Sequence, residues 1–321
     1  MLKPAELFYV SVISAILMLT SLTPLSADDS PLPETLRVSY VKLPLNVPAI
    51  IVKHRGMLEK EFAGDRIAIA WPEITSGGKQ TQALAARSID IASVVSSTSA
   101  ITARANGAGL KIVAVFARAP RAFNIMAIHP EITSIKALKG RKVAGPKGSL
   151  LNQTLFAALI AGGLHPEDVG YVHMPVPKAM AALIGGSVDA ALIAGPAVSK
   201  AESQGARIIA TGEGLVKGLI VTAVTESFLN KHADLIRRYL AVQKKALNFM
   251  QHHPDETYAI VARETGLDVK EVKRMYPWYN FDPAIETADI QDLEATQKFL
   301  LESGMLEKPV DMASLVTDLT K

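Results

Sequence analysis

The chain of 321 residues contains no cysteine, few aromatic side chains and almost no excess of either charge. The absence of cysteine excludes disulfides, thiolate metal sites, catalytic thiols and a lipidated N-terminal cysteine. The 34 Lys+Arg against 31 Asp+Glu leave a net charge of +3 with no basic block, so we expect no nucleic-acid partner. An aromatic content of 6% argues against an aromatic cage for quaternary ammonium ions.

The chain does have enough apolar sequence for large cores. Hydrophobic residues make up 49% and charged residues 20% of the sequence, a composition that excludes disorder. The length exceeds that of one small domain and fits two lobes of the usual size, about 100–200 residues each.

The N-terminus has the pattern of an export signal. Lys3 precedes an apolar run over 7–19, and Ala27 offers the small residue at which a signal peptidase cuts. A run of about 13 residues suits a signal peptide and falls short of the roughly 20 that span a bilayer. We therefore predict a signal peptide over 1–27, cleavage near Ala27 and a periplasmic protein. An uncleaved N-terminal anchor is the alternative, because Glu6 offsets Lys3.

Short apolar runs typical of strands alternate with helical stretches over most of the chain. This alternation predicts an α/β fold with parallel sheets covered by helices. The predicted strands are 36–40, 66–71, 89–95, 111–116, 123–128, 142–144, 169–173, 188–193, 207–210 and 219–224. The predicted C-terminal helices are 235–252, 254–265, 269–275 and 290–303.

The alternation restarts half-way, which suggests two lobes. Segment 86–92 is similar to segment 185–191, and each copy follows an Ala/Leu-rich helix and enters a buried strand. Chance similarity of common α/β turns is the alternative. We predict one lobe from 35–122 plus 221–321 and an inserted lobe from 123–220, joined by two crossover strands near 123–128 and 219–224.

Three segments resemble chemical motifs only loosely. Segment 212–214 has the glycines of a dinucleotide fingerprint, but a strand follows it instead of a helix. Segment 140–147 carries Pro146 where a phosphate loop needs its lysine. His252-His253 reads as a helix end, with Pro254 opening the next helix. We expect no metal and no cofactor.

Three turns between predicted strands and helices are rich in glycine and hydroxyl residues, at 76–78, 96–98 and 148–149. In parallel sheets such turns lie at the carboxyl ends of strands, where ligands bind. Their free backbone N–H groups and hydroxyls favour an anion. The alternative is that they only cap helices, as Ser, Thr and Gly commonly do.

Taken together, these segments and several others resemble a known family. It is the family of periplasmic solute-binding proteins of ABC importers, of the aliphatic sulfonate, taurine and nitrate type. These belong to the same superfamily as the binders of thiamine pyrimidine precursors. The segments that carry the resemblance are 38–53, 76–78 with 82–84, 88–90, 138–144, 147–149, 186–190 and 277–283.

The resemblance implies a two-lobed flytrap of the periplasmic-binding-protein type II, in which a small, anionic ligand binds between the lobes. It implies a membrane permease as partner and no catalysis, and we expect a monomer. The implied ligand contacts are Leu45, Asn46, Ser76, Gly77, Ser96, Ser97, Thr98, Ser149, Asn152, Gly195 and Pro196. Among these, we expect Ser76, Ser97 and Ser149 each to open a helix and to donate hydrogen bonds to an anion.

The resemblance leaves three questions open. Where sulfonate binders carry a Trp-Asp-Pro-type turn, this chain has Ala194-Gly195-Pro196, which widens the pocket and leaves sulfonate specificity open. A pyrimidine or other heterocyclic thiamine precursor is the alternative ligand, and a ligand-sensing receptor is the alternative role. An enzyme like the pyrimidine synthase of this superfamily is disfavoured, because that chemistry needs cysteine.

Overall fold

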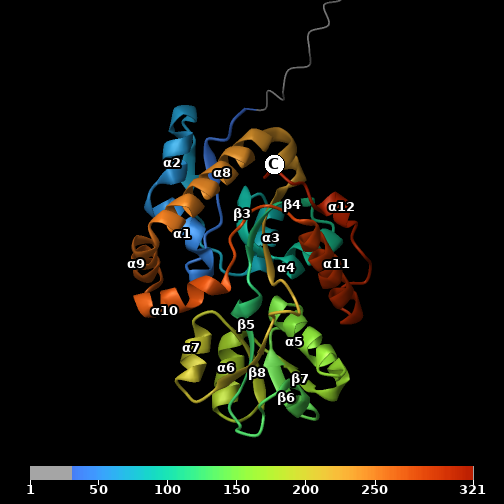
Figure 1. Ribbon diagram of the computed structural model, residues 1–321. Coiled ribbons are helices and arrows are strands. Elements are labelled where there is room, and N and C mark those ends of the chain that lie inside the picture. The colour runs from blue at the N-terminus through green and yellow to red at the C-terminus, as the bar shows by residue number, and fades with distance from the viewer. Residues whose placement is uncertain (1–30, 321) are drawn as a thin grey trace, which may run out of the picture. The chain divides into compact units, whose positions relative to one another are not determined.

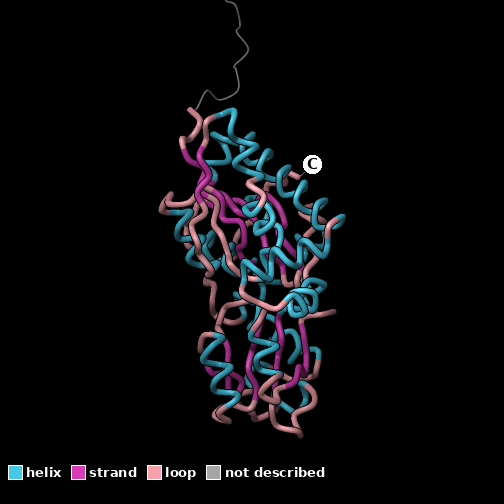
Figure 2. The backbone as a smooth tube through the Cα atoms, turned by 90° about the vertical axis from the view of Figure 1, so that its left-hand side faces the viewer, coloured by secondary structure: helices cyan, strands magenta, loops and turns pink. Residues whose placement is uncertain are grey.

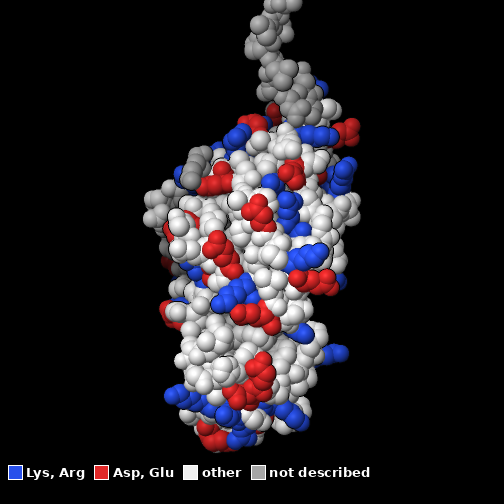
Figure 3. All heavy atoms as spheres, turned by 90° about the vertical axis from the view of Figure 1, so that its right-hand side faces the viewer, with Lys and Arg blue, Asp and Glu red and all other residues white. Residues whose placement is uncertain are grey.

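The computed structural model describes residues 31–320, which form two lobes, one above the other in Figure 1. The predicted signal peptide lies outside the described residues. Within the described part of the chain, no helix is both long enough and apolar enough to cross a membrane. On the face drawn in Figure 3, basic and acidic side chains are interspersed.

The upper lobe contains two small sheets. In the first, β1 (Thr35–Arg37) pairs in parallel with β2 (Ala68–Ala70). In the second, β10 (Leu219–Thr225) lies antiparallel between β3 (Ile91–Ser96) and β4 (Leu110–Arg118). These three strands are almost fully buried, as their continuous apolar sequences predict.

The lower lobe contains one sheet of five strands in the order β7-β6-β8-β5-β9. These strands are β5 (Phe123–Ala127), β6 (Lys142–Gly145), β7 (Gly170–His173), β8 (Ala190–Ala194) and β9 (Arg207–Thr211). β6 is parallel to β7 and β8, whereas β5 is antiparallel to β8 and β9. Figure 2 shows the two groups of strands, one in each lobe, with loop segments at the waist between them.

The prediction of parallel sheets was therefore wrong for the two sheets that adjoin the waist: the upper one is antiparallel and the lower one is mixed. The reason is the path of the chain. β5 and β10 each follow a passage from one lobe to the other, so each runs away from the waist, whereas β3, β6 and β8 run toward it.

Helices cover these sheets (Figure 1). In the lower lobe they are α5 (Leu150–Ala161), α6 (Val176–Ile184) and α7 (Ala197–Glu202). In the upper lobe they are α1 (Val47–His54), α2 (Met57–Phe62), α3 (Gly77–Ala85), α4 (Ser97–Ala105), α8 (Glu226–His252), α9 (Pro254–Thr265), α10 (Val269–Met275), α11 (Thr287–Glu302) and α12 (Met312–Leu315). The helix predicted from residue 235 begins earlier, at Glu226, with a kink at His232.

The chain passes between the lobes twice, through 119–122 and 212–218. The predicted crossover strands 123–128 and 219–224 each belong to a single sheet instead, and the passages are the short segments before them. The two passages run side by side, since the Ala119 amide donates to the Lys217 carbonyl at 3.0 Å. Gly218 has φ +61, and a Cβ there would lie 2.9 Å from the Ala119 backbone, so only glycine fits. The two-lobed α/β fold with two crossovers is confirmed, while the lobe boundaries stay a prediction.

Candidate ligand-binding site

Two helices of the upper lobe begin next to each other. Ser76 caps α3, and Ser96 caps α4 by accepting a hydrogen bond from the Ser99 amide at 3.2 Å. A Cβ on Gly77 would lie 3.1 Å from the Ser99 hydroxyl, so the two helix starts are in close contact there. Each start leaves backbone N–H groups without a partner in its own helix and places a positive dipole end at the same spot. The pair is therefore suited to an anion.

The cap of α4 is Ser96, not Ser97 as predicted. Ser97 is the first residue of the helix, it is completely buried, and no described protein group hydrogen-bonds its hydroxyl. Thr98 is also buried, and its hydroxyl lies 2.9 Å from that of Ser96. A Ser-Ser-Thr run contains three possible caps, and the point where β3 ends decides which one is used.

A buried polar network beneath these helix starts had no signal in the sequence. The Ser39 hydroxyl donates to Gln80 Oε1 at 2.7 Å, and the Ser93 hydroxyl donates to the Ser39 carbonyl at 2.6 Å. Gln80 Nε2 in turn donates to the Ile74 carbonyl at 2.8 Å, which fixes the loop before Ser76. The three polar side chains come from β3, α3 and the segment after β1, so no local spacing could have revealed them.

In the lower lobe, the turn at 146–152 holds Ser149 as the cap of α5. Its hydroxyl accepts from the Asn152 amide at 3.3 Å and donates to the Pro146 carbonyl at 2.7 Å. Asn152 is 1% exposed; its Oδ1 accepts from the Gly148 amide at 3.1 Å, and its Nδ2 has no partner in the described chain. Ser149 caps its helix as predicted, but its O–H is already used. The donor left over at this turn is Asn152.

A groove of the upper lobe extends to the turn before α5 in the lower lobe. It has a volume of 360 Å³, lies along α3 and α4, is lined by Gly78 and Thr98, and reaches Gly148 of the lower lobe. Met305, which follows α11, closes it at that end, because a Cβ on Gly148 would lie 2.6 Å from Met305 Cε.

A second pocket of 490 Å³ lies on the other side of Lys147 and Gly148. It is lined by Lys147, Asn152, Leu155, Phe156, Pro166, Glu167, Val169, Tyr171 and His173 of the lower lobe, by Glu302 of α11 and by Ser303, which follows α11. His173 Nδ1 accepts from the Lys147 amide at 2.9 Å, so its Nε2 carries the proton. The Tyr171 hydroxyl has no partner among the described groups, and burial raises the pKa of Tyr171. Hydrogen-bond donors thus outnumber acceptors on the lower-lobe side.

Of the predicted contacts, Thr98 lines the groove and Asn152 lines the second pocket, and the described lining of these two cavities includes none of the others. Those others are Ser76, Gly77, Ser96, Ser97 and Ser149 at the helix starts, and Leu45, Asn46, Gly195 and Pro196 elsewhere. Leu45 packs against the largest core cluster. Asn46 is buried, donates from Nδ2 to the Val41 carbonyl at 2.9 Å and leaves its Oδ1 unpartnered. Gly195 has φ +60 with open space around it, and Pro196 directly precedes α7.

The lobes also touch on both sides of the waist. On one side, Ser199 and Glu202 of α7 contact α10: the Ser199 hydroxyl donates to Glu271, and Arg274 lies 2.5 Å from Glu202. On the other side, α5 packs on α11, where Gln153 Nε2 donates to the Thr296 hydroxyl at 3.0 Å (Figure 1). Opening the lobes would have to break or bend these contacts.

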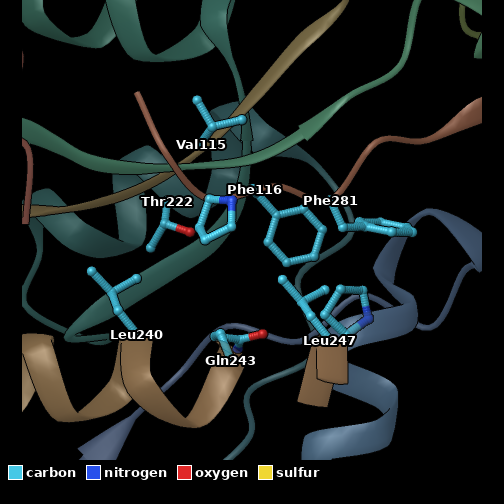
Figure 4. A pocket seen from close by; sticks show the side chains of 9 residues that line it. Val115, Phe116, Thr222, Leu240, Gln243, Leu247 and Phe281 are labelled. Atoms are coloured by element: carbon cyan, nitrogen blue, oxygen red, sulfur yellow. The ribbon is translucent and has the colours of Figure 1, made fainter. Parts of the chain in front are cut away.

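A further cavity lies inside the upper lobe, above α8 in Figure 4. Phe116, Leu240, Leu247 and Phe281 surround it, and the Gln243 amide is its main polar group. Its volume of 10 Å³ is about the room that one water molecule needs. It is too small for a solute.

Comparison with known proteins identifies the family. The model of the family described as NMT1/THI5 like matches residues 62–257. The chain belongs to this family. A Bacillus subtilis protein with the provisional name aliphatic sulfonates-binding protein is 30% identical over 275 residues, which cover 84% of this chain and 82% of the relative. The taurine-binding periplasmic protein of Escherichia coli is 26% identical, over 80% of this chain and 83% of its own.

A solved structure agrees in fold. The crystal structure of the periplasmic aliphatic sulphonate binding protein SsuA from Escherichia coli matches with a TM-score of 0.80 and 26% identity, over 88% of this chain and 97% of that one. The resemblance inferred from the sequence and the flytrap fold are therefore confirmed. These three proteins are named as binding proteins, in agreement with the expectation that this chain is not an enzyme.

Proposed function

We propose that this chain is the substrate-binding protein of an ABC importer that captures a small sulfonate-type anion between its lobes and delivers it to a membrane permease. One observation supports the proposal most: a groove along α3 and α4 of one lobe, lined by Gly78 and Thr98 near their starts, reaches Gly148 of the other lobe, in the turn before α5. Three helix starts supply N–H groups and positive dipole ends to a negatively charged head group.

The chemistry of the unpartnered groups supports an anion. The buried Ser97 hydroxyl and Asn152 Nδ2 are donors for which residues 31–320 offer no partner, and buried donors are nearly always hydrogen-bonded. A sulfonate offers three acceptor oxygens to such donors. The relatives named for aliphatic sulfonates and taurine favour this class over a heterocyclic thiamine precursor.

The remaining parts of the proposal follow from the same role. The protein is exported, with cleavage of the signal peptide near Ala27, and acts in the periplasm as a monomer. One lobe comprises 35–122 plus 221–321, and the other comprises 123–220. Ser76, Gly77, Ser96, Thr98, Ser149, Leu45, Asn46, Gly195 and Pro196 complete the contacts. Ligand contacts made to both lobes favour the closed state, and the permease recognises that state.

A thermal-shift screen of the purified protein tests the proposed ligand class. The panel contains taurine, alkanesulfonates, sulfate, nitrate, carboxylates and pyrimidines. A ligand at 100 times its dissociation constant adds about 2.7 kcal/mol to the free energy of unfolding, which raises the melting temperature by about 4 °C for a chain of this size. A shift with pyrimidines and none with any anion would overturn the proposal.

Uptake by cells tests the role in transport. Deleting the gene should abolish uptake of the ligand found in the screen, and a plasmid copy should restore it. Undiminished uptake in the deletion strain would contradict the importer role and favour a sensor.

A further inference from the structure

One buried carboxylate holds both passages between the lobes. Asp289, in the first turn of α11, is completely buried. It accepts hydrogen bonds from Arg118 Nε at 2.9 Å and Arg118 Nη2 at 2.5 Å, and from Lys217 Nζ at 2.9 Å. Arg118 is the last residue before the passage 119–122, and Lys217 lies at the end of the passage 212–218. The two cations thus flank the points at which the lobes must turn.

The rest of the surroundings makes this connection rigid. Arg118 also donates to the carbonyls of Asp282 at 3.0 Å and Ala284 at 2.8 Å, so its guanidinium is held on several sides. The Lys217 amide donates to Asp292 Oδ1, one turn further along α11, at 2.9 Å. A buried carboxylate with several charge-assisted hydrogen bonds has little freedom to move.

The same helix reaches the lower lobe. The Thr296 hydroxyl of α11 hydrogen-bonds Gln153 of α5, and both side chains are buried. One turn on, the Phe299 ring stands edge-on to the Phe156 ring, with centroids 5.1 Å apart. The N-terminal end of α11 therefore contacts the hinge, and the later turns of the same helix contact the lower lobe.

We propose that Asp289 is a positioning residue that fastens Arg118 and Lys217 to α11, so that the two passages between the lobes turn as one hinge and closure follows one path. The inference rests on the proposed function, because only a protein that closes on a ligand uses this hinge. Without the fastening, the passages move independently and the ligand-free protein samples more open arrangements. The apparent dissociation constant rises as the closing-competent fraction falls, by about tenfold for a tenfold smaller fraction.

The experiment measures the distance between the lobes directly and needs no ligand. Because the chain has no cysteine, Ala241→Cys on α8 and Lys178→Cys on α6 give two unique sites for spin labels on exposed residues. Electron–electron double resonance then records the distance distribution. The test variant is Lys217→Met, which releases the second passage and keeps the Arg118–Asp289 pair. Lys245→Met is the matched control, since it removes an exposed ion pair to Glu61 on the far side of the upper lobe.

We expect Lys217→Met to broaden the distribution and shift it to longer distances, and Lys245→Met to leave it unchanged. Asp289→Asn should broaden it further; if that variant fails to fold, Lys217→Met alone decides. A Lys217→Met distribution identical to that of the control would overturn the proposal. A separate taurine titration of the unlabelled protein tests the proposed ligand. If taurine does not bind, the proposed ligand is contradicted, but the distance measurement still tests the hinge because it needs no ligand.

Discussion

Replacing Ser97 with alanine should stabilise the ligand-free protein and weaken ligand binding. The Ser97 side chain is fully buried at the start of α4, and its hydroxyl has no partner among the described protein groups. Alanine keeps the backbone and the cap, because Ser96 supplies the cap. The substitution therefore removes one hydroxyl and little else.

The substitution should raise stability but lower ligand affinity, and the magnitude of each effect can be calculated. A buried hydroxyl without a hydrogen bond costs about 1–3 kcal/mol, so its removal should raise the melting temperature by roughly 2–4 °C or more. If Ser97 donates to the anion, the lost hydrogen bond to a charged group is worth about 1.5–3 kcal/mol. At 1.4 kcal/mol per factor of ten, the dissociation constant should rise about ten- to a hundredfold.

Calorimetric titration and thermal melts of the same samples give both numbers, with the ligand identified by the screen. Ser96→Ala serves as the comparison. It removes the cap, so it should lower stability by about 1 kcal/mol. A Ser97→Ala protein with unchanged affinity would refute the reasoning, since the hydroxyl would then have no role in binding. Lower stability in the ligand-free state would refute the assignment of Ser97 as an unsatisfied donor.

Three further outcomes are expected. Gly148→Ala should destabilise more than Gly163→Ala in urea unfolding: both have positive φ, which costs about 1–2 kcal/mol, but only at Gly148 does the new Cβ meet Met305. Arg274→Ala removes an interlobe ion pair of a kind worth about 0.2–1 kcal/mol, so stopped-flow release of ligand should speed up by less than about fivefold; slower release would contradict this. Burial alone would raise the pKa of Asp289, but its hydrogen bonds lower it below the usual value. The ionised Asp289 therefore contributes fully to the free energy of unfolding above about pH 4, and this contribution is lost as the pH falls further. In an acid titration, the Asp289→Asn variant should lack this part of the loss of stability.

The fold could be predicted from the sequence because its strands are short apolar runs between turn residues. Leu219–Thr225 is such a run, and it forms the central strand of the upper sheet. Strand direction was not predictable from these runs. It depends on where the chain enters each lobe, and the passages at 119–122 and 212–218 carry no periodic pattern of their own.

The candidate site was predictable where one residue acts locally and not where several act together. Ser149 caps α5, as a serine between a strand and a helix suggests. By contrast, Gln80 and Asp289 each connect segments far apart in the chain, Gln80 with Ser39 and Asp289 with Arg118. Neither residue belongs to a motif, and only the packing of distant elements brings these polar groups within hydrogen-bond distance.

At the starts of α4 and α5, one residue caps the helix and a different residue keeps a free hydrogen-bond donor. At both starts the cap hydroxyl is already used: Ser96 bonds to its own helix, and Ser149 bonds to Asn152 and to Pro146. At these two helix starts, the side-chain groups that find no partner in the described part of the chain belong to residues just inside the helices. They are Ser97 at the first position of α4 and Asn152 at the third position of α5. A cap residue therefore stabilises the helix start, while a residue within the first turn keeps a donor for the ligand. Substituting the cap should change stability first, and substituting Ser97 or Asn152 should change affinity first.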